Sequence, residues 1–307
     1  MQKPQNHHTR YALIGAALVF IAAVTVSSKA IMVKLAYAYP VDASTLIALR
    51  MAFSVPFFIG LAVWARASAS TPKLTRKDAY LIAVMGVLGG YGPMWFDFAG
   101  LAYVTAGLER IILYIYPTIV VVMGAVLFKQ KISKAAYYAL GITYIGVIIA
   151  VGHDVFSLKS DASGTLLGVM LVTISAFAYA AYLVASGRLI PRVGAAAFTA
   201  YTMLVAAVTS LVHYASTSHQ VTIFNLPKSV YIIGLLMAIF ATVLPAILLN
   251  LGIQRIGSSK AALISSVGPV STILLAYVYL GENITLLQII GTGLVLVGVL
   301  IVSLSKH

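Results

Sequence analysis

The sequence predicts an all-helical membrane protein with ten transmembrane helices, arranged as two inverted five-helix repeats. Of its 307 residues, 61% are hydrophobic and only 9% are charged, whereas a soluble globular chain is roughly half apolar and about a quarter charged. A chain of this composition cannot hide its apolar side chains in a fold surrounded by water, so it is expected to cross the membrane many times. The second observation is that the sequence repeats itself.

The internal repeat has an offset of 152 residues, at which residues 127–133 recur as residues 279–285. The same offset carries Pro93 onto Pro245, Pro117 onto Pro269, Gly141 onto Gly293 and Gly146 onto Gly298. A repeat with a long period determines the architecture before any local motif does. We therefore predict a first five-helix repeat over residues 1–152 and a second over residues 153–307.

Ten apolar segments are long enough to span a membrane, because each is near the ~20 residues that a helix needs to cross the hydrocarbon layer. Helices are the expected spanning element, since backbone groups in lipid need partners within their own segment. The expected spans are residues 11–36, 43–65, 79–100, 104–128, 134–152, 164–187, 195–215, 229–251, 257–280 and 285–304. The first is longer than the apolar region of a signal peptide, so we expect it to be retained.

The distribution of Lys and Arg between the loops predicts the orientation, because cytoplasmic loops carry the excess. One side of the membrane is predicted to hold Lys159 and Lys228. The other side holds Lys3, Arg10, Arg66, Lys73, Arg76, Lys77, Lys129, Lys131, Lys134, Arg188, Arg192, Arg255, Lys260 and Lys306. We therefore predict a multi-pass protein of the cytoplasmic (inner) membrane with both termini in the cytoplasm. Because five is an odd number of spans, the second repeat starts on the opposite side and is inverted.

Most of the net charge of +13 comes from the Lys and Arg residues of the predicted cytoplasmic loops. A nucleic-acid partner would instead require a basic face on a soluble domain, so none is expected. The chain has no cysteine, which excludes disulfides, thiolate metal sites and cysteine nucleophiles. The sequence also lacks an ATP-binding loop motif, a metal-ligand spacing and an arguable Ser/His/Asp set. Neither a cofactor nor a metal is expected.

The closing part of each repeat resembles a known family. Residues 269–298 hold the landmarks Pro269, Leu280-Gly281-Glu282, Gln288, Gly291, Gly293 and Gly298. Together with ten spans in two repeats, this pattern resembles the EamA-type transporters of the drug/metabolite transporter superfamily. The first repeat departs from it, with Lys129-Gln130 where Gly-Glu is usual. The resemblance implies a permease for a small organic compound, such as an amino acid or a drug, more often acting in efflux.

Ionisable side chains inside the spans are the first candidates for function, since each costs roughly 2.5 kcal/mol or more in lipid. These residues, all in the predicted outer half, are Lys29, Lys34, Arg50, Asp97, Glu109 and Arg110. Their counterparts at the offset are the uncharged Ala181, Ser186, Thr202, Leu249, Ala261 and Ala262. Because a requirement of the fold would recur in both repeats, we predict that Lys29, Arg50, Glu109 and Arg110 line the substrate cavity or a gate.

The alternative is that the charges form structural ion pairs, such as Asp97 with Arg110 or Glu109 with Arg50. Lys34 and Asp97 lie near helix ends, where a side chain can reach the interface or water. The surplus of cations favours a substrate that carries a carboxylate or a phosphate. Glu109 or Asp97 is also a candidate for coupling transport to protons, the simplest energy source in the absence of an ATP-binding motif.

Four prolines lie inside spans, at equivalent positions of the two repeats: Pro93, Pro117, Pro245 and Pro269. Each removes a backbone hydrogen bond and bends its helix. We predict that they are hinges for alternating access, although bends that merely shape the bundle would recur in the same way. Pro56 has no counterpart at the offset and is predicted to be a local kink.

Aromatic and uncharged polar side chains complete the predicted cavity. Aromatic rings can stack on an apolar or cationic group, or can belong to the interfacial belt, and Ser and Thr often serve helix packing. The candidates are Tyr91, Trp95, Phe96, Tyr114, Tyr116, Tyr179, Tyr182, Asn250, Gln254, Ser265 and Ser266, with Trp95, Tyr114, Tyr179 and Asn250 preferred. Two glycine patterns, Gly86-x-x-Gly89-Gly90 and Gly141-x-x-x-x-Gly146, are predicted to be faces of close helix packing.

These observations predict a secondary transporter, not an enzyme, that moves a small organic metabolite by alternating access between inverted repeats. The cavity is expected between spans 1, 3, 4, 6, 8 and 9. The expected partners are the substrate, the lipid bilayer and protons, and the protein is expected to be a monomer or a homodimer. The alternatives are a membrane-embedded enzyme acting on lipid-linked substrates, and a passive metabolite pore.

Overall fold

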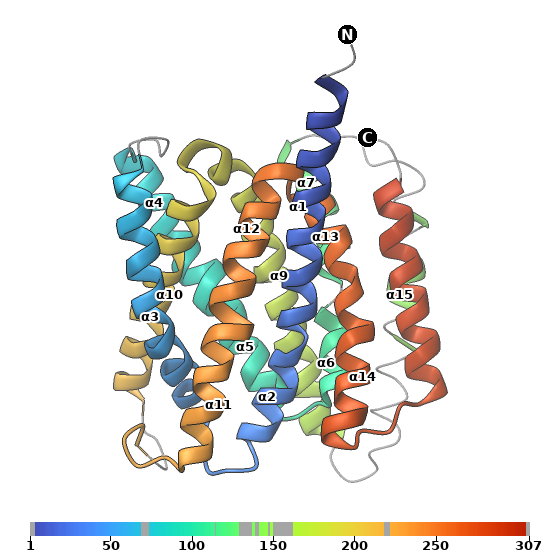
Figure 1. Ribbon diagram of the computed structural model, residues 1–307. Coiled ribbons are helices and arrows are strands. Elements are labelled where there is room, and N and C mark those ends of the chain that lie inside the picture. The colour runs from blue at the N-terminus through green and yellow to red at the C-terminus, as the bar shows by residue number, and fades with distance from the viewer. Residues whose placement is uncertain are drawn as a thin grey trace.

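The structure is a computed structural model in which the described residues form one helical bundle without strands (Figure 1). It describes residues 4–68, 74–113, 115–128, 137–138, 141–146, 148–149, 162–217 and 222–304. Seven helical segments within these ranges are long and apolar enough to cross a membrane: Arg10–Ala36, Ala43–Ala67, Arg76–Leu101, Ala106–Gly124, Ser163–Val193, Ala195–Ser216 and Lys228–Ile256. Two shorter apolar helices follow, Val270–Leu280 and Leu286–Gly298. The predicted all-α membrane class is confirmed.

The helices fall near the predicted spans, and several spans contain two or three helical segments. In the first half these are α1 (Pro4–Val26), α2 (Ser28–Ala36), α3 (Ala43–Ala67), α4 (Arg76–Val84), η1 (Met85–Tyr91), α5 (Gly92–Leu101), α6 (Ala106–Leu113) and α7 (Tyr116–Phe128). In the second half they are α9 (Ala162–Val193), α10 (Ala195–Ser216), α11 (Lys228–Ala238), η2 (Ile239–Val243), α12 (Leu244–Ile256), α13 (Ser258–Ile264), η3 (Ser265–Val267), α14 (Gly268–Leu280) and α15 (Leu286–Leu304). Most of the predicted span 134–152 lies outside the described residues.

The third and eighth spans are interrupted in the same way. A π-helical segment, η1 or η2, comes directly before α5 or α12, and Pro93 or Pro245 is the second residue of the helix that follows. Proline has no N–H and its ring displaces the carbonyl four residues earlier, so the regular ladder cannot continue through it. The wider π turn accommodates the proline. The first residues of α5 and α12 are 152 residues apart, which is the offset of the sequence repeat.

The fourth and ninth spans are also divided at equivalent places. The helix α7 begins at Tyr116 and the helix α14 begins at Gly268, and each has proline as its second residue, Pro117 or Pro269. A 3₁₀ turn, η3, precedes α14. Because α7 and α14 also begin 152 residues apart, the duplication is visible in the secondary structure as well as in the sequence.

The first span is found where it was predicted, as Arg10–Ala36, but it contains two helices instead of one continuous helix. Ser27 separates α1 from α2 without a proline. The Thr25 hydroxyl donates to the carbonyl oxygen of Ile21 and the Ser27 hydroxyl to that of Ala23, both at 2.8 Å. Hydroxyls that bond back to the preceding turn compete with the backbone ladder and bend helices. The sequence signal for the break was therefore a run of Ser and Thr.

Three helix pairs make the most extensive contacts between the two halves: α3 with α10, α1 with α12, and α5 with α9. At the offset of the repeat, α3 corresponds to α10, α1 to α9, and α5 to α12. The pair α1–α12 is therefore the counterpart of the pair α9–α5. Each half of the chain packs its first helix against the third span of the other half.

Glycines bring the backbones together at both of these counterpart crossings. A Cβ built on Gly100 would lie 3.1 Å from the carbonyl oxygen of Gly168, and one on Gly252 would lie 3.1 Å from that of Gly15. Gly100 and Gly252 are 152 residues apart. Small residues of this kind allow transmembrane helices to approach closely.

The packing role predicted for the first glycine pattern is confirmed. A Cβ on Gly86 would lie 2.5 Å from the Val205 Cβ of α10, and one on Gly89 would lie 2.7 Å from the Tyr182 ring of α9. In the second pattern, a Cβ built on Gly146 would lie 2.6 Å from the carbonyl oxygen of Gly291. Gly141 differs, since a Cβ there would meet no described atom within 4 Å.

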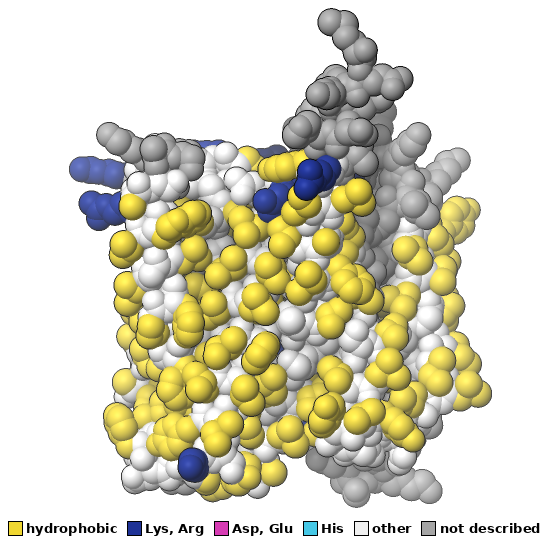
Figure 2. All heavy atoms as spheres, in the orientation of Figure 1, with side chains coloured by type: hydrophobic (Ala, Val, Ile, Leu, Met, Phe, Trp, Pro, Cys, Tyr) yellow, Lys and Arg dark blue, Asp and Glu magenta, His cyan; other side chains and the backbone are white. Residues whose placement is uncertain are grey.

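The surface of the bundle matches its composition. Figure 2 shows one face, on which hydrophobic side chains cover the height of the bundle while most visible Lys and Arg side chains lie along one rim. The helix α1 begins and α15 ends at this same end of the bundle (Figure 1). We call it the upper end, and the end where α2 finishes the lower end.

Candidate functional site

A cavity of about 200 Å³ lies between the two halves of the chain, and both contribute to its wall. All six predicted spans line the cavity, and they are joined by Arg50 of α3 and Met203 of α10. Its polar wall residues include Lys29, Arg50, Asp97, Arg110 and Asn250. The structure therefore brings together several residues that are distant in the sequence.

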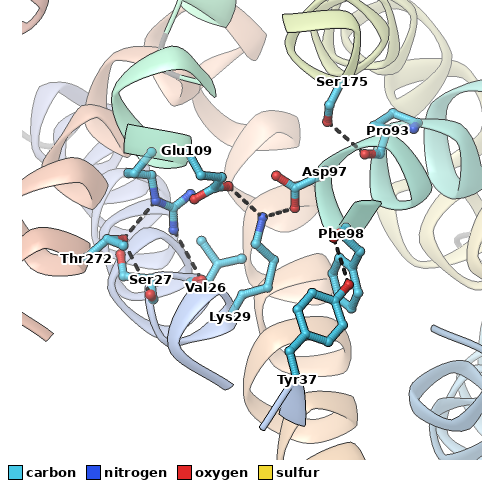
Figure 3. A network of polar contacts seen from close by, with 11 residues as sticks. Val26, Ser27, Lys29, Tyr37, Pro93, Asp97, Phe98, Glu109, Ser175 and Thr272 are labelled. Carbon is cyan, nitrogen blue, oxygen red and sulfur yellow. Dashed lines mark hydrogen bonds and ion pairs between the residues drawn. The ribbon is translucent and has the colours of Figure 1, made fainter. Parts of the chain in front are cut away.

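Lys29, in the first turn of α2, joins two carboxylates (Figure 3). Its ammonium group forms ion pairs with Asp97 of α5 and, at 3.1 Å, with Glu109 of α6. Glu109 is fully buried and is not part of the cavity wall, whereas Asp97 is. The break between α1 and α2 directs the start of α2 toward these helices. One oxygen of each carboxylate, Asp97 Oδ1 and Glu109 Oε2, has no hydrogen-bond partner among the described atoms.

Arg110 has a different position from the one that an ion pair with Asp97 would require. Its Nε donates to the Thr272 hydroxyl of α14 at 2.8 Å, and an Nη atom donates to the carbonyl oxygen of Val26 at 3.2 Å (Figure 3). The Thr272 hydroxyl in turn donates to the Ser27 carbonyl oxygen at 3.3 Å. Arg110 and Thr272 thus satisfy backbone groups released where α1 ends. They also connect the first half of the chain to the second.

Arg50 was predicted to pair with Glu109 as the structural alternative, but Glu109 is bound by Lys29. The Arg50 side chain is only 3% exposed, and its guanidinium carbon lies 4.9 Å from the centre of the Phe98 ring. Its Nε has no hydrogen-bond partner among the described atoms. No described carboxylate lies within ion-pair distance of it. Arg50 therefore places a buried positive charge on the cavity wall.

Three tyrosines form an aromatic part of the cavity wall. The Tyr116 and Tyr179 rings meet edge to face with centres 5.0 Å apart, and Tyr179 stacks on Tyr182 at 6.2 Å. Asn250 of α12 donates to the Thr199 hydroxyl at 2.8 Å, while its Oδ1 has no described partner. These side chains provide stacking surface and one free acceptor.

Other predicted site residues lie elsewhere. Trp95 is not part of the cavity wall: its indole N–H donates to the Ser44 hydroxyl at 3.3 Å, and its ring packs edge-on against Phe96 and His213. Tyr91 contacts the same imidazole. Aromatic character in the right span did not indicate which side of the helix a ring would occupy.

The remaining predicted residues have mixed positions. Pro93 and Pro245 line the cavity, and Pro117 and Pro269 lie in the first turns of α7 and α14. Ser265 is on the wall. Gln254 is exposed, Lys34 is half-buried near the lower end, and Tyr114 lies outside the described residues.

Two polar side chains that were not predicted as site residues, Ser175 and Glu282, also connect helices. Ser175 of α9 donates to the Pro93 carbonyl oxygen at 2.7 Å (Figure 3). Glu282, which follows α14, accepts from the backbone N–H groups of Ala106 at 2.9 Å and Gly107 at 3.2 Å. A carboxylate at a helix N-terminus is favourable because the first N–H groups of a helix lack internal partners. The sequence motif Leu280-Gly281-Glu282 contained this residue, but the sequence did not indicate that Glu282 would bind the start of α6.

The sequence is similar to those of known proteins. The model of the EamA-like transporter family matches residues 13–152 and again residues 166–304. The uncharacterized transporter YcbK of Bacillus subtilis is 29% identical over 296 residues, which cover 95% of this chain and 94% of that protein. The uncharacterized inner membrane transporter YicL of Salmonella typhimurium is 27% identical over 233 residues, with 76% and 75% covered.

The fold is also found in a crystal structure of a protein with 19% sequence identity, which superposes with a TM-score of 0.68 over 96% of this chain and 97% of that one. This likeness shows a shared fold. Within the described part of the chain, no group of three or more potential metal ligands comes together.

Proposed function

The chain belongs to the EamA-like transporter family, and from this premise we propose that it is a secondary active transporter that exports a small organic metabolite, such as an amino acid or a drug. The observation that carries the proposal is the cavity, which lies between helices of both halves and has a mostly apolar wall that holds several charged and polar side chains. A site at the junction of two repeats is where secondary transporters bind their substrates. Lys29, Arg50, Arg110, Tyr179 and Asn250 are proposed to contact the substrate.

The proposed mechanism is alternating access between two inverted five-helix repeats, one within residues 1–152 and the other within 153–307. Two features support the inverted arrangement. The helix α1 begins at the upper end whereas α9 begins at the lower end and rises (Figure 1). The reciprocal helix pairs α1–α12 and α9–α5 are also what a two-fold relation between repeats produces. Ten transmembrane helices, five in each repeat, complete this proposal.

The proposed hinges are Pro93, Pro117, Pro245 and Pro269. Each lies at the start of a helix that follows a π segment, a 3₁₀ turn or another interruption. Short segments with weaker hydrogen bonding can absorb the backbone rotation that opens one end of the cavity and closes the other. The gate at the lower end would then include Glu109 and Lys29, which hold α6, α5 and α2 together.

Proton exchange is the proposed source of energy. Asp97 is on the cavity wall and Glu109 lies behind Lys29, so Asp97 is the carboxylate that cavity water reaches. A proton on Asp97 would release one of the two ion pairs of Lys29. The motion of that ammonium group would connect protonation to the packing of α2 against α5 and α6.

The proposed location is the cytoplasmic (inner) membrane, with both termini on the cytoplasmic side. The upper end of the bundle would then face the cytoplasm, because cytoplasmic loops carry the excess of Lys and Arg. The visible basic rim supports this orientation (Figure 2). The proposed partners are a small-molecule substrate, the lipid bilayer and protons, in a monomer or a homodimer.

Counterflow in proteoliposomes tests the proposal. Purified protein would be reconstituted and loaded in turn with unlabelled amino acids and other metabolites, and uptake of the same labelled compound would be measured. We expect saturable uptake that the internal compound accelerates and that Lys29→Ala abolishes, whereas the exposed Lys228→Ala does not. Unsaturable flux without counterflow would indicate a pore, and chemical conversion without flux would indicate an enzyme.

A further inference from the structure

The Arg50 guanidinium is a cavity cation that forms no ion pair with a described carboxylate, although Asp97 lies on the same cavity wall. Lys29 is bound by Asp97 and Glu109, and Arg110 donates to α14 and to the end of α1. Arg50 is only 3% exposed, yet its Nε has no hydrogen-bond partner among the described atoms. Buried polar groups in proteins nearly always have a partner. A donor of this kind on a cavity wall indicates a ligand.

The charges around the cavity set the charge of that ligand. With every group ionised, three cations (Lys29, Arg50 and Arg110) face two carboxylates (Asp97 and Glu109), so one positive charge is left over. An uncompensated charge away from water is unfavourable. A bound group with a single negative charge removes the excess. A dianion would turn the excess positive charge into an excess negative charge. A neutral compound would leave the positive excess unchanged, and a cation would increase it.

The position of the guanidinium favours a planar anion. Phe98 makes a cation–π contact with it, at 4.9 Å from ring centre to guanidinium carbon. The N–H groups at the edge of a guanidinium match the two oxygens of a carboxylate. Beyond this point the cavity is lined by Tyr116, Tyr179 and Tyr182, which suit an apolar or aromatic body.

The second repeat shows that the fold does not require this cation. The residue at the matching position is Thr202, which is buried and donates to the Phe198 carbonyl oxygen at 2.6 Å. That hydroxyl is satisfied within its own helix. An arginine in one repeat only, without a described protein anion, therefore fits a ligand better than a structural role.

We infer that the transported compound is an organic monoanion, a carboxylate with an apolar or aromatic body, whose anionic group binds Arg50. This inference rests on the proposed transport function and names its substrate class. A zwitterion is the competing class, because its ammonium group would find a free acceptor in Asp97 Oδ1. The charge balance favours the monoanion over the zwitterion.

The test is a matched set of probes added to the purified full-length protein, with the melting temperature as readout. The set is 3-phenylpropionate, its neutral amide, the zwitterion phenylalanine and the dianion phenylsuccinate. A second set with an unbranched six-carbon body consists of hexanoate, hexanamide, 2-aminohexanoate and hexanedioate. A compound that binds the native state raises the melting temperature. We expect the monoanion to give the largest rise in at least one set.

Two substitutions separate recognition from structure. We expect Arg50→Met to abolish the rise given by the monoanion and to weaken its binding by roughly 10- to 100-fold. The melting temperature of ligand-free Arg50→Met should equal or exceed that of the wild type, because an uncompensated buried charge has been removed. The control Lys29→Met should melt at a lower temperature than the wild type without ligand, since it leaves two buried carboxylates unpaired.

Three results would overturn the inference. One is a rise with the amide, zwitterion or dianion as large as that with the monoanion. Another is no difference between wild type and Arg50→Met with any probe, and the third is a ligand-free loss in Arg50→Met as large as in Lys29→Met. Counterflow of a neutral or zwitterionic compound through Arg50→Met would refute the inference while leaving the transporter proposal intact. Absence of counterflow with every compound would count against transport itself, whatever the melting data show.

Discussion

Lys29 shows how one side chain can determine the role of its neighbours. An ammonium group in a membrane is tolerated when it meets opposite charge, and Lys29 has two carboxylates, on α5 and α6. Each of these carboxylates uses one oxygen to bind Lys29, and neither lies within ion-pair distance of Arg50. The predicted pairs Asp97–Arg110 and Glu109–Arg50 are replaced by this arrangement.

The two carboxylates are expected to differ in proton coupling. In proteoliposomes with a compound that shows counterflow, a one-unit pH gradient should support at most about tenfold accumulation for one-to-one exchange. Asp97→Asn should remove this accumulation and retain counterflow, because Asp97 lines the cavity. Glu109→Gln should keep the dependence on the gradient and lower the melting temperature, because Lys29 loses an ion pair.

The comparison of these two variants is the control for damage to the fold. Both substitutions keep the side-chain shape and remove one negative charge next to Lys29. A pH-driven accumulation that persists in Asp97→Asn and disappears in Glu109→Gln would assign proton coupling to the opposite carboxylate.

At the scale of elements, interrupted helices recur at equivalent places. The segments η1 and η2 precede Pro93 and Pro245, and both prolines reach the cavity wall. A proline bend shared by two helices that line one cavity changes the width of that cavity when it flexes.

Removing these prolines is expected to slow transport. Pro93→Ala and Pro245→Ala each allow one more backbone hydrogen bond, worth about 1 kcal/mol, so the maximal rate of counterflow should fall several-fold with little change in half-saturation. Pro56→Ala is the control, because Pro56 is exposed in α3 and has no proline counterpart in the second repeat. Equal rates in all three variants would indicate that Pro93 and Pro245 only shape the bundle and do not act as hinges.

Glycine crossings make a separate prediction about stability. Gly100→Val and Gly252→Val should each lower stability by about 1–3 kcal/mol, because a side chain there overlaps the opposite backbone. The readout is the melting temperature in detergent. Gly60→Val is the control, since a Cβ at Gly60 meets nothing within 4 Å. A loss at only one crossing would argue against equivalent packing of the two repeats.

At the scale of the whole molecule, the two halves exchange partners, as α1 packs on α12 while α9 packs on α5. The cavity lies where these pairs meet, so neither half could form it alone. The start of α1 and the end of α15 lie at the same, upper end of the bundle (Figure 1).

The proposed orientation is testable because the chain contains no cysteine. A cysteine introduced at Asn225, in the exposed segment before α11, should react with a membrane-impermeant maleimide in intact cells. A cysteine introduced at Arg76, which is exposed at the start of α4, should react only after the membrane is permeabilised. The reverse pattern would invert the proposed topology, and reaction of both sites in intact cells would contradict their placement at opposite ends.

The sequence alone determined the membrane class, the duplication and the positions of most helices. These properties depend on composition, on apolar length and on a constant offset, all of which are local or periodic. Five of the residues predicted for the cavity, Lys29, Arg50, Arg110, Tyr179 and Asn250, do line it. Their role in transport stays a prediction, made because charged and polar side chains in lipid are costly enough to stand out.

The tertiary structure decided which of these residues meet. Trp95 and Lys29 both belong to spans that line the cavity, yet the Trp95 ring lies against Ser44 and His213 while Lys29 reaches two carboxylates. A helix presents its residues to different neighbours around its axis, and which neighbour lies on each side depends on the crossing of distant helices. Partner choice therefore required the packed bundle, in which the Nε of Arg50 has no hydrogen-bond partner among the described atoms.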